Sequence, residues 1–157
     1  MSKDETGRMT GPMCIRLAFA SGELEVRAAL AQLRHGLAPM HLSEADTGTV
    51  ELVLGEVLNN VVEHAYGPEA TGRIEMECEP LGTALFFNVR DQGRALPGLR
   101  LPSGRPPDVD GALDDLPEGG FGWFLVRSLA NGLDYRRDDG CNVLEFNIPL
   151  REMQGMA

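Results

Sequence analysis

Three short groups of polar residues and glycines contain the side chains that could do chemistry in this chain of 157 residues. The first group is Glu56 and Asn60, whose spacing places both side chains on one face of a helix. Asparagine is a mediocre helix former, so the pair Asn59 and Asn60 inside a long helix indicates a role beyond helix stability. A solvated helix face is the alternative, because polar residues at this spacing are common.

The second group is Asp91, Gln92 and Gly93, where an apolar strand gives way to an irregular segment. A carboxylate at a strand end suits a ligand bound against the edge of the sheet, and the glycine after it allows a close backbone approach. The same residues also suit a simple turn. Asp91 is therefore the candidate binding side chain of this group.

The third group is a glycine-rich turn directly before a helix, formed by Gly119, Gly120, Phe121 and Gly122. Glycines let backbone N–H groups point outward and the helix N-terminus adds partial positive charge, so this turn can hold an anion such as a phosphate. No Gly-Lys-Ser/Thr follows, and no strand directly precedes the turn, so neither a P-loop nor a dinucleotide fingerprint fits. A flexible entry to the helix is the alternative.

Hydrophobic periodicity predicts the elements that position these groups. The longest periodic segment is a helix that begins at Ser43, with Asp46 in a capping-box-like start, and ends at about Tyr66, before Gly67 and Pro68. Two more helices are expected, one over Val26 to Leu37 and one over 121–130. Alternating apolar residues predict strands at 14–20, 73–79, 84–90, 133–137 and 142–148.

The order of these elements predicts one α/β domain, because two strand pairs are joined as hairpins and the helices alternate with them. We expect a two-layer α/β sandwich whose mixed, largely antiparallel sheet carries the helices on one face. The domain is expected to span residues 12–150, with a flexible N-terminus at 1–11 and a flexible tail at 151–157. The proline- and glycine-rich segment 92–119 is expected to be a mobile lid.

Composition excludes several classes of protein. The formal charge of −10 disfavours direct binding to nucleic acid, whose affinity comes mainly from Lys and Arg contacts. No apolar stretch approaches the ~20 residues that a membrane-spanning helix needs, and no signal peptide is visible. The three cysteines, Cys14, Cys78 and Cys141, lie far apart and cannot all be paired, so we expect reduced thiols and a cytoplasmic location.

In their order along the chain, these groups resemble the N box, G1 box and G2 box of the GHKL, or histidine-kinase-like, ATPase superfamily, which has the Bergerat fold. The segment 55–66, GEVLNNVVEHAY, resembles the N box of the anti-sigma-factor serine/threonine kinase branch, including its terminal His-Ala-Tyr. The G1 box reads DQGRA at 91–95, and the segment 120–127, GFGWFLVR, resembles the G2 box. The resemblance extends from about Ile15 to Pro149.

This resemblance implies an anti-sigma regulatory factor that binds ATP and Mg²⁺ and phosphorylates Ser or Thr of an anti-sigma-antagonist protein in a partner-switching pathway. Asn60 would bind Mg²⁺, Asp91 would accept a hydrogen bond from the adenine amino group, and Gly93 would let the base approach. Glu56 would be the general base that takes the hydroxyl proton. The glycine-rich turn at 119–122 would lie beneath the phosphates.

Two alternatives stay open from the sequence. Glu118 stands where some kinases of this branch carry an arginine, and a carboxylate there repels phosphate, which favours a non-catalytic nucleotide-binding module that sequesters a regulatory partner. A detached histidine-kinase ATPase domain is the second alternative, because residues 33–39 superficially resemble a phospho-accepting histidine box around His35. The partner would be a sigma factor, an antagonist protein or both, and homodimerisation is left open.

Overall fold

Alternating apolar residues form five strands that pair into one sheet in the order β1-β2-β3-β5-β4. The structure, a computed structural model, describes residues 3–9, 13–67, 70–103 and 120–151. All four pairings between these strands are antiparallel, so a largely antiparallel sheet is confirmed and no parallel pair occurs among the described strands. The strands are β1 (Ile15–Ala20), β2 (Arg73–Leu81), β3 (Ala84–Asp91), β4 (Asn131–Asp138) and β5 (Cys141–Pro149).

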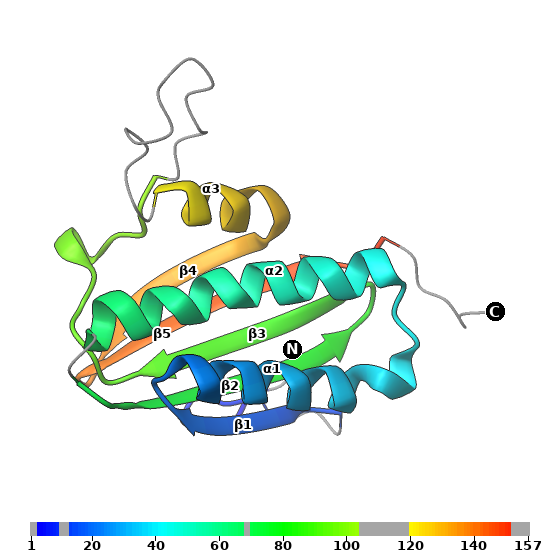
Figure 1. Cartoon of the computed structure of the whole chain (residues 1–157), viewed down its shortest axis with the longest axis horizontal. Helices are drawn as coiled ribbons and strands as arrows, with labels where there is room; N and C mark the ends of the chain where they lie inside the picture. Colours follow the sequence, from blue (N-terminus) through cyan, green and yellow to red (C-terminus); the bar gives the residue numbers. More distant parts are fainter. Residues whose placement is uncertain (1–2, 10–12, 68–69, 104–119, 152–157) are drawn as a thin grey trace, which may run out of the picture.

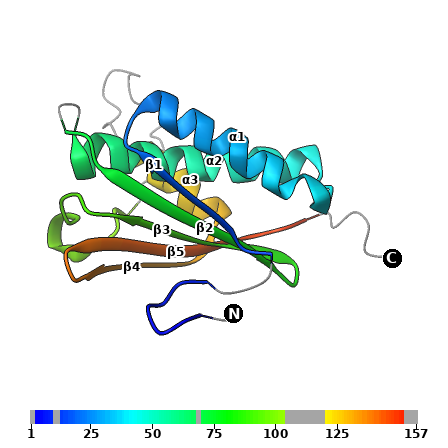
Figure 2. The ribbon, with the colours of Figure 1, turned by 90° about the horizontal axis from the view of Figure 1, so that it is seen from below.

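The described α-helices cover one face of this sheet, as Figures 1 and 2 show from two directions. They are α1 (Glu23–Leu37), α2 (Glu44–Asn60) and α3 (Gly120–Leu129). Short 3-10 turns follow α1 at Ala38–Met40 and lie at Pro97–Leu99, within the part of the expected lid that the structure describes. The two-layer α/β sandwich expected from the sequence is thereby confirmed.

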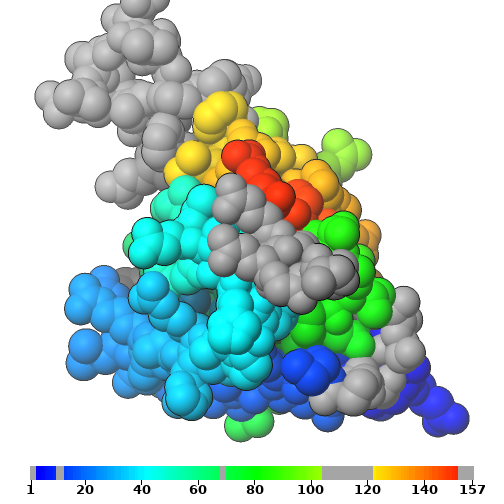
Figure 3. Space-filling view, turned by 90° about the vertical axis from the view of Figure 1, so that its right-hand side faces the viewer, coloured from blue at the N-terminus to red at the C-terminus, as the bar shows by residue number. Residues whose placement is uncertain are grey.

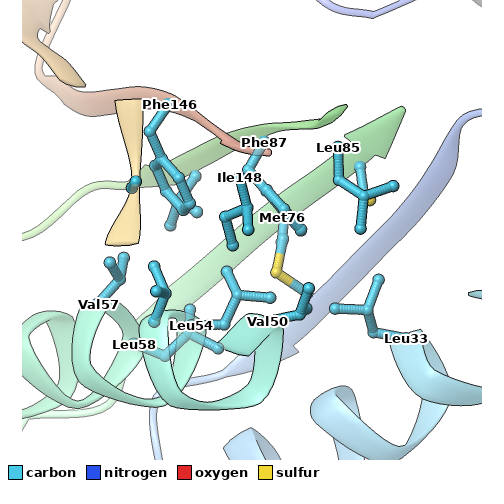
Figure 4. Packing of buried hydrophobic residues seen from close by; sticks show 14 of the residues in the cluster. Leu33, Val50, Leu54, Val57, Leu58, Met76, Leu85, Phe87, Phe146 and Ile148 are labelled. Atoms are coloured by element: carbon cyan, nitrogen blue, oxygen red, sulfur yellow. The ribbon is translucent and has the colours of Figure 1, made fainter. Parts of the chain in front are cut away.

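The core lies between the sheet and the helices and is built from every second residue of each strand. On β3 and β5 the inward positions include Phe87 and Phe146, whose rings stack with centroids 5.3 Å apart (Figure 4). The predicted apolar stripe of α2 faces them, because Leu54 and Leu58 are completely buried. Burial of such side chains supplies the main stabilisation of the fold, about 1.5–3 kcal/mol for each large one.

Helix α2 begins as its sequence predicts. Ser43 has extended backbone angles, and its hydroxyl oxygen accepts a hydrogen bond from the N–H of Asp46 at 3.0 Å. This bond satisfies one of the backbone donors that the first turn of a helix leaves unpaired.

The variant Ser43→Ala is therefore expected to lower the free energy of unfolding by about 1 kcal/mol, the usual cost of losing such a cap. Chemical denaturation measures this change. Ser128→Ala is the control, because the Ser128 hydroxyl only donates to the carbonyl oxygen of Phe124 within α3 and caps nothing. Equal losses in the two variants would contradict the capping role.

The end of α2 differs from an ideal helix. The α-helical pattern stops at Asn60, and the six residues Val61–Tyr66 continue as a π-helix to Gly67. The expected helix end near Tyr66 is thus correct, but the last part of the segment is wound more widely than an α-helix. Such π segments are rare and often occur at functional sites.

The N-terminal residues 3–9 belong to the segment that the sequence predicts to be flexible, and in the structure they make several contacts. They pack on the sheet face opposite the helices (Figure 2), where Lys3 binds the Glu145 carboxylate at 2.8 Å. Met9 is only 1% exposed, and its N–H donates to Glu77 Oε2 at 3.0 Å. Charged residues on the outer face of the sheet, such as Glu77 and Glu145, offer partners to this polar segment.

At the other end of the chain, Leu150 is buried and the N–H of Arg151 donates to Asp46 Oδ1 at 3.1 Å. The end of the last strand is therefore bound to the start of α2. Figure 3 shows this end of the molecule, with α1 and the start of α2 on one side and the β2–β3 turn on the other. Residues 152–157 of the expected tail and 104–119 of the expected lid lie outside the described residues. Within the described part, no helix is long and apolar enough to span a membrane.

Candidate functional site

A pocket of about 600 Å³ lies against the inward face of the sheet beside the end of α2. Residues from α2, the π segment, three strands, the loop after β3 and α3 contribute to its walls. The volume is in the range of small-molecule sites, and the walls are mainly apolar with a few polar groups, as in such sites generally. The polar lining residues are Asn60, His64, Asp91, Arg94, Tyr135 and Asn142.

Asp91 is the carboxylate of this pocket. It ends β3 on the inward face of the sheet, where it is 6% exposed. Its Oδ1 accepts hydrogen bonds from the N–H of Gly93 at 2.9 Å and from Asn142 Nδ2 at 2.8 Å. Burial raises the pKa of Asp91, and these two donors together with the Arg137 charge oppose that rise. Both of these bonds reach the same oxygen, so Oδ2 is the atom that can accept a hydrogen bond from a ligand.

Gly93 is needed for the close contact between this loop and the π segment. A Cβ at Gly93 would lie 2.5 Å from the carbonyl oxygen and 2.6 Å from the carbonyl carbon of Ala65. The next residue, Arg94, donates its N–H to the same carbonyl oxygen at 2.8 Å. The absence of a side chain therefore lets the loop bond directly to the end of the helix.

Tyr66 makes a second connection at the same place. Its hydroxyl donates to the carbonyl oxygen of Arg73 at 2.6 Å and accepts from the N–H of Gln92 at 2.7 Å. Burial is the main cause that raises the pKa of this hydroxyl. The tyrosine thus joins the end of the π segment, the start of β2 and the loop after β3.

Glu56 and Asn60 lie one turn apart on α2. Asn60 lines the pocket, and its Nδ2 donates to the Glu56 carbonyl oxygen at 2.8 Å. This bond leaves Oδ1 as the Asn60 atom that can bind a cation or a ligand. The Glu56 carboxylate lies against the first turn of α3, because a Cβ at Gly122 would overlap its Oε2.

The glycine-rich turn is described only in part. Gly120 begins α3 and Gly122 is buried beside Glu56, whereas the side chain of Phe121 and all of Gly119 lie outside the described residues. Trp123, one residue further along α3, lines the pocket. The first turn of this helix, whose backbone N–H groups have no partner within an α-helix, therefore lies next to the pocket that contains Asp91 and Asn60.

The polar side chains of the pocket suit a cation only when a bound ligand supplies further oxygen atoms. Among the described residues, no group of three His, Cys, Asp or Glu side chains could hold a metal ion by itself. Mg²⁺ does not need such a cage, because it usually keeps several waters and binds one or two protein oxygens together with phosphates. Asn60 Oδ1 fits that kind of site.

The structure brings several of the predicted residues together. Asp91 and Asn60 line one pocket, Gly93 lies in the loop that closes it, and Glu56 lies beside the start of α3. Sequence reasoning missed Asn142, Tyr135 and Tyr66. A signal for Asn142 was present, because it has the same strand parity as the apolar residues at 144, 146 and 148 and is therefore a polar residue on the inward face.

The sheet is antiparallel and carries its helices on one face. The pocket is bounded by β3, β5, α2 and the start of α3. This arrangement is that of a histidine-kinase-like ATPase fold. The chain belongs to the family of histidine kinase-like ATPase domains, which its residues 19–148 match. All three predicted motif regions, at 55–66, 91–95 and 119–127, lie within the matched range.

Similar curated proteins are named as protein kinases. The chain is 32% identical over 96 residues to the serine/threonine-protein kinase BtrW of Bordetella bronchiseptica, covering 61% of this chain and 66% of that protein. It is 29% identical over 109 residues to the serine-protein kinase RsbW of Bacillus cereus, covering 68% of this chain and 67% of that one. The chain thus spans about two thirds of the length of these relatives.

One solved structure supports the fold. The crystal structure of the RsbU and RsbW domains of Rv1364c from Mycobacterium tuberculosis superposes with a TM-score of 0.61. The match covers 91% of this chain and 34% of that chain, at 18% sequence identity. At this identity the likeness concerns the fold alone.

Proposed function

We propose that the chain is an ATP-dependent protein serine/threonine kinase that acts as an anti-sigma regulatory factor. It binds Mg-ATP and phosphorylates a Ser or Thr of an anti-sigma-antagonist protein in a partner-switching pathway. One observation carries the proposal: Asp91 from β3, Asn60 from α2 and the first turn of α3 meet at one pocket. The names of the BtrW and RsbW relatives support the same assignment.

In this proposal Asp91 recognises the adenine base. The base enters between apolar walls that include Val89 and Leu144, and its amino group donates to Asp91 Oδ2. Gly93 keeps the loop beside the base close to the helix. The phosphates extend toward the glycine-rich turn, residues 119–122, where N–H groups of a helix start favour anions.

Asn60 is the proposed magnesium ligand. Its Nδ2 is held by the Glu56 carbonyl oxygen, so the side chain presents Oδ1 as a hard oxygen ligand. When bound, Mg²⁺ neutralises part of the phosphate charge that develops during transfer. The protein's own contribution is to orient this oxygen from a helix that is fixed by its buried face.

Glu56 is the proposed general base. Its carboxylate lies beside Gly122, at the turn where the phosphates would lie, and can accept the proton of a partner's hydroxyl. As the hydroxyl oxygen bonds to the γ-phosphorus, the proton moves to Glu56 and ADP leaves with the electrons of the broken phosphorus–oxygen bond.

The partners follow from the proposed role. A sigma factor, an anti-sigma-antagonist protein or both would bind a cytoplasmic protein of this kind, and the charge of −10 favours protein partners over nucleic acid. Whether the protein forms a homodimer is a separate prediction, for which sedimentation at several concentrations is the test.

Isothermal titration calorimetry with ATP and Mg²⁺ tests the nucleotide site, with Asp91→Asn as the variant. Gly93 N–H and Asn142 Nδ2 are both donors, so the new amide oxygen would face them and its NH₂ would face the adenine amino group. Two donors would then oppose each other, and we expect the affinity to fall roughly 10- to 100-fold.

Asp134→Asn is the matched control, because Asp134 is an exposed aspartate on β4 outside the pocket. We expect its ATP affinity to equal that of the native protein. Absence of ATP binding by the native protein would end the proposal, and unchanged affinity in Asp91→Asn would remove Asp91 from it.

Transfer of labelled phosphate to a purified antagonist protein separates the proposed kinase from its alternatives. Phosphate on the partner that is stable to acid and lost in alkali supports a serine/threonine kinase, whereas acid-labile phosphate that survives alkali indicates a histidine kinase. Nucleotide binding without transfer to any antagonist would favour the non-catalytic module that Glu118 suggests; this residue lies outside the described part of the chain.

A further inference from the structure

Asn142 is a buried polar residue on the inward face of the sheet. It lies near the start of β5, directly opposite Asp91 in the register with β3, and is 6% exposed. A buried amide is costly unless all of its polar atoms are paired. Its partners therefore show what the side chain holds in place.

Both polar atoms of the Asn142 side-chain amide, Nδ2 and Oδ1, make hydrogen bonds. Its Nδ2 donates to Asp91 Oδ1 at 2.8 Å and to the carbonyl oxygens of Arg94 at 2.8 Å and Gly93 at 3.4 Å. These partners are all acceptors, so only the NH₂ group can face them. The amide consequently has one allowed orientation.

The Oδ1 of Asn142 accepts from two residues of β4. The Tyr135 hydroxyl donates to it at 2.6 Å and Arg137 NH1 donates to it at 3.0 Å. The same hydroxyl accepts from the N–H of Leu96 at 2.9 Å, and the same guanidinium donates to the carbonyl oxygen of Gly93 at 2.7 Å. The loop at 93–96 is therefore bound to β4 and β5 at several points.

We propose that Asn142 is a positioning residue that sets the selectivity of the pocket for a purine with an amino group at C6. The inference rests on the proposed nucleotide site. Asn142 holds one carboxylate oxygen of Asp91 and leaves the other for the ligand, and it also holds the loop that borders the same pocket. One side chain therefore fixes both Asp91, which would bind the base, and the loop that forms a wall of the pocket.

The chemistry of the ligand follows from this geometry. A carboxylate held in one orientation accepts a hydrogen bond from a C6 amino group and repels a C6 carbonyl oxygen. A site built to receive a donor rejects an analogue that lacks it, because the buried acceptor is left unpaired. If Asp91 is free to rotate, this discrimination weakens.

The test compares ATP with inosine triphosphate, which carries a carbonyl oxygen in place of the amino group at C6. Binding of both is measured by calorimetry to the native protein and to Asn142→Ala. We expect the native protein to prefer ATP by about 100-fold or more. In Asn142→Ala the ATP affinity should fall roughly 10-fold or more while the inosine nucleotide affinity changes little, so that the preference shrinks.

Asn147→Ala is the matched control. Asn147 lies on the same strand, where it is opposite Phe86, but its position has the other parity, so its side chain is on the other face of the sheet from Asn142. Its preference for ATP should equal that of the native protein. Tyr135→Phe is a second variant, which keeps the ring and removes only the hydroxyl that joins Asn142 to Leu96. It should show a smaller loss of preference and decides the question if Asn142→Ala does not fold.

The outcomes distinguish this inference from the proposed function. Equal losses of affinity for both nucleotides in Asn142→Ala would mean a merely structural role and would overturn the inference. Affinities for both nucleotides equal to those of the native protein would also overturn it. Both results leave ATP binding by the native protein intact. A native protein that binds neither nucleotide overturns the proposed function and the inference with it.

Discussion

Replacing Glu56 by glutamine is expected to reduce phosphate transfer by roughly 100- to 10,000-fold, the usual contribution of a general base. Glutamine has nearly the same shape, so it can keep the contact with Gly122, but it cannot take the hydroxyl proton. The Asn60 amide bonds to the backbone carbonyl of residue 56 and not to its side chain, so that bond survives the substitution. The ATP affinity should therefore stay close to that of the native protein.

The measurement needs two readouts on the same preparation. Transfer of labelled phosphate to the antagonist protein reports the reaction, and calorimetry reports ATP binding. Glu51→Gln is the control, because Glu51 is another partly exposed acid of α2, whose ion pair with Arg34 lies away from the pocket. Equal loss of transfer and binding in Glu56→Gln would contradict its role as base, since a base acts on the reaction and not on the affinity.

The variant Gly93→Ala is expected to have the second large effect, a loss of ATP affinity of about 100-fold or more with a fall in stability of about 1–3 kcal/mol. The added Cβ would lie 2.5 Å from the carbonyl oxygen of Ala65, which is backbone and cannot rotate away. The loop must then move from the helix. That movement breaks the bond from Arg94 N–H and displaces the donor that holds Asp91.

Gly48→Ala is the matched control for this substitution. Gly48 lies inside α2, and a Cβ there would meet nothing within 4 Å. Alanine is the better helix former, so we expect stability to rise by up to about 1 kcal/mol with ATP affinity unchanged. Denaturation and calorimetry check both variants. Native-like binding in Gly93→Ala would show that the loop does not need its contact with Ala65.

The elements of the fold were largely predictable because their signals are local. Helix α2 has a side-chain cap at its start, a long apolar stripe and a glycine after its end, and each of these signals acts within a few residues. The alternation of apolar residues in β3 and β5 likewise predicts their inward faces. The π-helical winding after Asn60 has no such local signal in the sequence, and the loop after β3 contacts this segment at Ala65.

The packing of residues 3–9 on the sheet could also not be predicted from the sequence. Nothing in a short polar segment indicates that Met9 would be buried or that Lys3 would bind Glu145, which is 142 positions away. Such contacts depend on which charges the folded sheet presents on its outer face. A flexible segment is therefore the natural expectation until the tertiary structure is known.

By itself, the sequence determined the order of the elements, the sandwich architecture and the types of the site residues, because period, capping and spacing are properties of neighbouring residues. It indicated Glu56, Asn60 and Asp91 as site residues, with an ordinary helix face or turn as the alternative for each. Only the tertiary structure decided that Asp91 and Asn60 line one pocket and that Asn142 holds the carboxylate in place. The reason is physical: Asp91 and Asn142 are 51 positions apart, and pairing of β3 with β5 brings them together.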